Sequence, residues 1–225
     1  MPLGCLEQAA KDVRARLTWR VSVLDGEGER VEAWSNPATR SHTIMLPPVG
    51  ERDYHLLHGL ILAEFAETRP PLVSSNKIWG VSIASQNLIR AFYLAAARDW
   101  FVTGRIATLC PDELRAALEA EAAMLTPVEP AGNPLTIDRM TLGSEEKDRI
   151  LAALHLAKVR RWVDGGEKAA DEVTEALAQA FGAVDPEMPG IEGMLGVVNG
   201  LCEVFDRRCF TANEEKGYWM VEARG

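Results

Sequence analysis

The chain has 225 residues, of which 47% are hydrophobic and 25% are charged. These proportions are typical of globular proteins and exclude a disordered or fibrous chain. The formal net charge of -9 repels nucleic-acid phosphates and anionic membrane surfaces, so we expect no direct binding to either.

The N-terminal part combines one amphipathic helix with short β-favouring segments. Apolar residues recur at helical spacing over residues 3–17. Strands are expected over three segments, residues 19–24, 30–34 and 42–46. The turn-forming residues 25–28 (DGEG) lie between the first two strands, which predicts a β-hairpin. We therefore expect a small antiparallel sheet of three strands.

Helical spacing of apolar residues dominates the remainder of the chain. Helices are expected over residues 53–68, 85–106, 112–125, 144–163, 167–181 and 191–205, with a short strand over 217–222. Three prolines and two glycines mark residues 126–143 as a loop or linker. The prediction is a mainly helical α+β fold, with a core over residues 1–125 and a helical C-terminal region over residues 144–225. That region either extends the first domain or forms part of it.

Two of the expected helices set a carboxylate into an apolar face. Glu64 lies within the apolar stripe of one helix, and Asp99 lies within that of another. An ionised carboxylate among apolar groups is costly unless a cation, a metal ion or several donors compensate it. Either the two acids share a site, or each is satisfied locally. The local candidates are a helix N-terminus and three arginines, Arg90, Arg98 and Arg105.

Histidine and cysteine spacing gives weaker indications. His55 and His58 stand three residues apart on a helix, a spacing that can hold a metal ion. The helical wheel turns both of them largely away from Glu64, which favours a solvated or half-buried pair. The four cysteines include no C-x-x-C pair, which indicates neither a zinc knuckle nor a disulfide framework and favours a reducing cytoplasm.

One stretch of the chain is similar to a known family. Residues 43–47 read T-I-M-L-P, and the helix that follows carries H-G-L-I-L-A-E-F-A-E-T-R over residues 58–69. This order resembles the core of bacterial and phage zincin-like metallopeptidases related to cobaltochelatase subunits with von Willebrand A partners. That family has a T-I-x-L-P strand and then R-G-x-x-x-H-E-x-x-H-x-R. The resemblance spans residues 40–120 and places Glu64 at the position of the family's general base.

The zinc ligands of that family are missing. Ala63 and Glu67 stand where the resemblance would place two zinc-binding histidines, and Thr103 stands where it would place a third, acidic ligand. Catalytic zinc needs three protein ligands, usually with imidazole among them, so zinc peptidase chemistry and a zinc cofactor are not expected. Glu64, Glu67 and Asp99 do offer three oxygens, which suit a harder divalent cation such as Mg²⁺ or Mn²⁺.

Three functions remain open from the sequence. The first is a catalytically degenerate metallopeptidase-like protein that binds a protein partner or acts as a scaffold in a phage or bacterial system. The second is a metal-dependent hydrolase with Glu64 as its base and an oxygen-rich site of Glu64, Glu67 and Asp99. The third is an acidic inhibitor that occupies the basic groove of a nucleic-acid enzyme, suggested by the net charge of -9.

Overall fold

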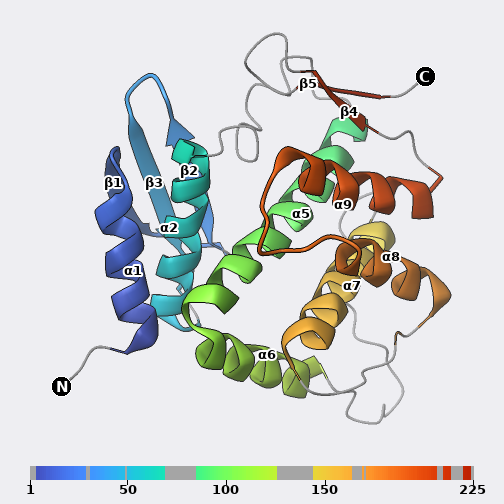
Figure 1. Ribbon diagram of the computed structural model, residues 1–225, viewed down its shortest axis with the longest axis horizontal. Coiled ribbons are helices and arrows are strands. Elements are labelled where there is room, and N and C mark those ends of the chain that lie inside the picture. The colour runs from blue at the N-terminus through green and yellow to red at the C-terminus, as the bar shows by residue number, and fades with distance from the viewer. Residues whose placement is uncertain are drawn as a thin grey trace.

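A computed structural model describes most of the chain, and most of the described residues lie in helices (Figure 1). The described residues are 4–28, 31–48, 50–68, 85–125, 144–163, 169, 171–206, 210–213 and 220–223. The helices among them are α1 (Cys5–Arg16), α2 (Arg52–Thr68), α5 (Ser85–Leu109), α6 (Pro111–Leu125), α7 (Ser144–Trp162), α8 (Glu172–Gly182) and α9 (Ile191–Val204). The strands are β1 (Arg20–Asp25), β2 (Glu32–Asn36), β3 (Ser41–Leu46), β4 (Phe210–Asn213) and β5 (Met220–Ala223). The predicted mainly helical α+β class is confirmed.

The three N-terminal strands form a mixed sheet in the order β1-β3-β2. β3 pairs in parallel with β1 and antiparallel with β2. The predicted hairpin between the first two strands, and with it the all-antiparallel sheet, is therefore wrong. β3 takes the centre because its alternate residues His42, Ile44 and Leu46 are all buried, whereas β1 and β2 are partly exposed along their length.

Helix α2 packs on the face of the sheet that carries these buried residues (Figure 1). The approach is close at Gly59, where an added Cβ would lie 2.4 Å from Cγ2 of Ile44. Only a glycine allows the helix to lie so near the strand. This close contact gives a physical reason for a glycine at position 59.

Helix α5 connects the N-terminal sheet to the C-terminal helices, and one hydrophobic core runs through both. Trp100 of α5 is buried, and its Nε1 donates a hydrogen bond of 3.0 Å to the carbonyl of Val184, beyond α8. An added Cβ at Gly104 would lie 2.4 Å from the carbonyl oxygen of Pro186, so backbone meets backbone here. The described residues of 144–206 thus complete the core around α5, while the predicted linker 126–143 lies outside the described residues.

Most predicted helix limits lie within about three residues of the observed ones, but α8 begins at Glu172 and not at residue 167. The predicted tail strand overlaps β5, which pairs antiparallel with β4. Among the described residues, no helix is both long and apolar enough to cross a membrane.

Candidate functional site

Three polar residues of helix α2, His58, Glu64 and Glu67, each contact a different neighbour. At about 100° per residue, His58 and Glu67 lie on opposite sides of the helix, and Glu64 lies nearer to Glu67. Their side chains therefore reach different elements. The contacts of each decide whether the predicted oxygen-rich metal site exists.

Glu64 is held between two arginines. Nε of Arg16, in α1, donates to Oε1 at 2.9 Å, and Nε of Arg105, in α5, lies 3.5 Å from Oε2. The Glu64 side chain is only 13% exposed, so the charges are partly desolvated. Local compensation by Arg105, one of the two readings left open by the sequence, is what the structure shows. The contribution of Arg16 comes from a residue 48 positions away.

Glu67 points to the side of α2 opposite His58, toward β3 and the segment between α1 and β1. Its oxygens accept hydrogen bonds from the backbone N–H groups of Thr18 and Trp19 at 2.9–3.0 Å and from the Thr18 hydroxyl at 2.6 Å. Nε2 of His42 lies 2.9 Å away. Burial opposes ionisation, but these hydrogen bonds outweigh it and lower the pKa of Glu67 to about 2. The carboxylate thus anchors α2 to the sheet.

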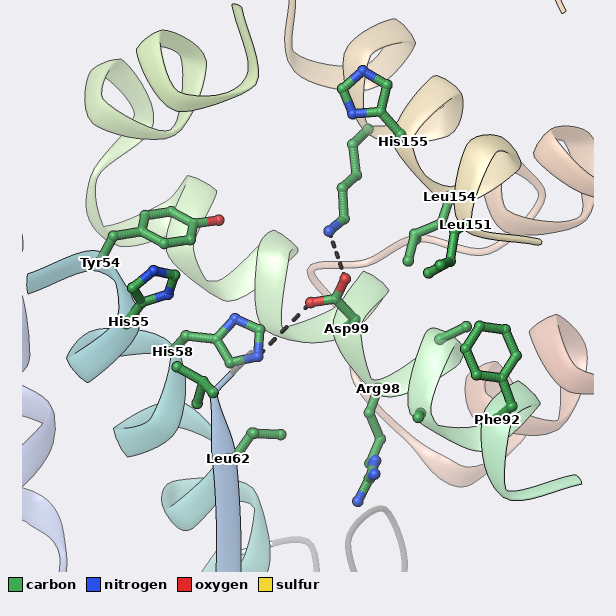
Figure 2. Close-up of a pocket in the computed structure, with 14 residues that line it drawn as sticks. Tyr54, His55, His58, Leu62, Phe92, Arg98, Asp99, Leu151, Leu154 and His155 are labelled. Atoms are coloured by element: carbon green, nitrogen blue, oxygen red, sulfur yellow. Dashed lines mark hydrogen bonds and ion pairs between the residues drawn. The ribbon is translucent and has the colours of Figure 1, made fainter. Parts of the chain in front are cut away.

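Asp99 pairs with groups on other helices. Its Oδ2 lies 2.6 Å from Nζ of Lys158 in α7, and its Oδ1 lies 3.8 Å from Nε2 of His58 in α2 (Figure 2). The carboxyl group is 32% exposed. The structure therefore does not bring Glu64, Glu67 and Asp99 together, because each has its own partners. They also do not appear as a compact cluster of metal-ligating atoms within the described part of the chain.

The His58–Asp99 contact borders a cavity of about 410 Å³ between α2, α5 and α7. His55 and His155 also line this cavity, so the structure places both predicted histidines, His55 and His58, at one site away from Glu64. Burial lowers the pKa of His58 to about 4, although Asp99 pulls it upward. At neutral pH the imidazole is therefore uncharged and can donate one hydrogen bond and accept another.

The cavity has a polar end and an apolar wall. Figure 2 shows His58 and Asp99 pointing toward one another, with Arg98 directed away from Asp99. Two cationic side chains, Lys158 and Arg98, and one acidic side chain, Asp99, line the cavity. The apolar wall consists of Val31, Leu62, Phe92, Ala95, Ala96, Leu151 and Leu154. The arrangement suits a small molecule that has an anionic group and an apolar body.

The family's zinc position does not fit zinc in this chain. Ala63 is completely buried and supplies no donor, and Thr103 is buried with its hydroxyl bonded to the carbonyl of Asp99 at 2.7 Å. Glu67 is committed to Thr18, Trp19 and His42. A second cavity, of about 390 Å³, does lie beside Glu64 and Arg105. Its described lining contains no imidazole or thiolate that would select zinc.

One close group of metal-ligating side chains occurs among the described residues, and no residue spacing in the sequence predicts it. Ligand atoms of Cys5, Cys110 and Glu113 all lie within 4.8 Å of one another. Cys5 begins α1, and Cys110 precedes Pro111 at the start of α6. Spacing rules for metal motifs look for neighbouring cysteines, so two cysteines this far apart in the chain carry no local signal.

Comparison with known proteins does not extend this description. No family model, curated protein or solved structure matches the chain.

Proposed function

We propose that the chain is a binding or scaffold protein with a metallopeptidase-like frame and no zinc peptidase activity, in a phage or bacterial system. The observation that carries this proposal is the placement of Glu64 between Arg16 and Arg105. A general base in a metallopeptidase must face a metal-bound water. Here both carboxylate oxygens face guanidinium groups instead.

The donor set supports the same conclusion. Replacing an imidazole by Ala63 removes a ligand, and Glu67 would have to give up its hydrogen bonds to the backbone and to His42 before it could bind a cation. Leaving the buried His42 imidazole without this partner would cost about 1–3 kcal/mol. The oxygen-rich hydrolase therefore has little geometric support, and the acidic-inhibitor alternative rests on net charge alone.

The binding site that we assign to this function is the cavity beside Asp99. An anionic group placed at its polar end would meet Lys158 Nζ, which is only 13% exposed, and the imidazoles of His55 and His58. Charge interactions are stronger in such a partly dehydrated site than at the surface. An apolar body would then lie against Phe92 and the leucines of the wall. We infer a small aryl or alkyl carboxylate or phosphate as the ligand class.

Metal analysis and peptide cleavage test the loss of peptidase activity. Purified protein is expected to cleave no peptide library, and Glu64→Gln should leave its metal content unchanged. Glu187→Gln, which alters an exposed acid on the same second cavity, is the matched control. Peptide cleavage and zinc that both disappear in Glu64→Gln, but persist in Glu187→Gln, would defeat the proposal.

Thermal shift with benzoate, hexanoate and phenyl phosphate tests the cavity. A ligand at about 100 times its Kd stabilises the folded state by about 2.7 kcal/mol, which raises the melting temperature measurably. Lys158→Met should abolish the shift, whereas Lys11→Met, which removes an exposed cation from α1, should retain it. Shifts that are equal in both variants would show that the anions act at the general surface.

A protein partner is the second candidate, and the outer face of the sheet favours it. Leu24 and Trp34 are 52% and 46% exposed, and both lie on the face opposite to Ile44. Exposed large apolar side chains on one sheet face are typical of interaction surfaces. A photo-crosslinking residue at position 34 in the source cell should give one discrete adduct that the same residue at position 7 does not give. Identical labelling from both positions would remove this candidate.

A further inference from the structure

Three side chains that can bind a metal ion lie together where α1 begins and where α5 ends and α6 begins. The two sulfur atoms of Cys5 and Cys110 and a carboxylate oxygen of Glu113 lie within 4.8 Å of one another. Sγ of Cys5 also donates to the carbonyl of Leu109 at 3.4 Å, which holds α1 against the end of α5. Cys110 is completely buried, whereas Cys5 and Glu113 are half-buried, so the group opens to solvent on one side.

The donor set selects a particular class of cation. Two thiolates and one carboxylate suit soft or borderline ions such as Zn²⁺ and Cd²⁺, whereas Mg²⁺ and Ca²⁺ require oxygen ligands. In tetrahedral zinc sites with Zn–S bonds of about 2.3 Å, the sulfur atoms lie about 3.8 Å apart. The observed separations need only small side-chain adjustments to reach that geometry. The fourth position would be open to water.

The helices also favour negative charge at this place. The carbonyl of Cys110 accepts from the backbone N–H of Leu114 at 3.0 Å, which makes Cys110 the residue that caps α6, and Glu113 lies in the first turn. Cys5 is the first residue of α1. Helix N-termini stabilise thiolates and carboxylates because their free N–H groups and dipoles are positive.

We propose that Cys5, Cys110 and Glu113 form a structural site for a thiophilic divalent cation, with Zn²⁺ as the physiological ion. The bound ion would join α1 to the α5–α6 junction. The site lies away from Glu64 and Asp99. It does not depend on the function proposed above. Binding replaces two thiol protons by two metal–sulfur bonds, so two protons are released for each ion bound.

The protonation of the free site makes binding depend on pH. An ordinary thiol, with a pKa of about 8.5, is mostly protonated at neutral pH, and it binds a cation as the thiolate. A cation must displace that proton. Affinity should therefore increase as the pH rises through the neutral range.

Cadmium titration of the full-length, reduced protein tests the site. One equivalent of Cd²⁺ should produce sulfur-to-metal charge-transfer absorption in the ultraviolet, and Zn²⁺ should compete for it. Cys5→Ser should remove the absorption, and Glu113→Gln should weaken binding by about tenfold or more, since even outer-shell partners of metal ligands matter that much. Cys202→Ser, at a buried cysteine of α9, is the matched control and should bind as the natural protein does.

The outcome separates this site from the peptidase question. Metal that is lost in Cys5→Ser but retained in Glu64→Gln supports the cysteine site and leaves the proposed function untouched. Absence of stoichiometric charge-transfer absorption would overturn the site, as would absorption that survives in Cys5→Ser. A Cys5–Cys110 disulfide in protein purified without reductant, with no cation bound after reduction, would also overturn it.

Discussion

Replacing Glu67 by glutamine removes the charge that anchors α2 to the sheet. The pKa of Glu67 is lowered from an ordinary value of 4.5 to about 2 by the Thr18, Trp19 and His42 hydrogen bonds. At about 1.36 kcal/mol for each pKa unit, the ionised form stabilises the fold by about 3 kcal/mol. The Glu67 side chain is only 9% exposed, so water does not greatly weaken these interactions. We expect Glu67→Gln to lower the free energy of unfolding by about 2–3 kcal/mol at neutral pH.

The same pKa fixes the sign of the pH dependence. A lowered pKa in the folded state means that the unfolded chain binds more protons, so the stabilisation is complete above about pH 4.5. It is lost as the pH falls from there toward about 2. The difference between the natural protein and Glu67→Gln should therefore be constant near neutrality and shrink on acidification.

Urea denaturation at neutral pH and at about pH 3.5 measures both effects. Glu7→Gln is the matched control, because Glu7 forms an exposed pair with Lys11 on α1 and should change the free energy of unfolding by less than about 0.5 kcal/mol. If Glu67→Gln is as stable as Glu7→Gln, or if its deficit does not shrink in acid, the anchoring role of this carboxylate is refuted.

Two other substitutions test the packing and the cavity. Gly104→Ala should destabilise the fold by about 1–3 kcal/mol in urea denaturation, because its Cβ would meet the Pro186 carbonyl at 2.4 Å. Gly182→Ala, whose Cβ meets nothing within 4 Å, should be neutral within about 0.5 kcal/mol. Lys158→Met removes a cation that lowers the pKa of His58, so NMR titration of that imidazole should show a pKa above about 4. An unchanged His58 pKa would contradict the electrostatics assigned to the cavity.

Local patterns predicted the elements well and their pairing poorly. Helical periodicity found the described helices because an amphipathic stripe is encoded within each segment. The order of the strands depends on which strand is buried between the other two. The turn-forming residues 25–28 favoured a hairpin between the first two strands, and this hairpin does not form. β3 lies between β1 and β2 because its alternating residues are the most deeply buried of the three. The alternation of apolar residues in β3 can be recognised as decisive only when the three strands are compared with one another.

The partial burial of the two acids was predicted, but the site that they were expected to share does not form. The apolar stripes placed Glu64 and Asp99 on partly buried faces, as observed, because burial follows helical periodicity. The partners of these acids depend on where the charged ends of long arginine and lysine side chains lie in the folded chain. Arg16 reaches Glu64 and Lys158 reaches Asp99 from elements remote in the chain. The closeness of the cysteine pair is equally a product of tertiary packing.

The geometry of α2 alone argues against a metal ion shared by Glu67 and Asp99. Asp99 approaches α2 on the side of His58, and Glu67 points to the opposite side of the helix, toward His42 and β3. An α-helix is about 10 Å across with its side chains, whereas carboxylate oxygens lie about 2–2.6 Å from the ion that they bind. One ion cannot contact both residues while α2 stays in place. A cation site that needs both Glu67 and Asp99 is therefore excluded. Among the described residues, the ligating atoms of Cys5, Cys110 and Glu113 are the ones that lie close together.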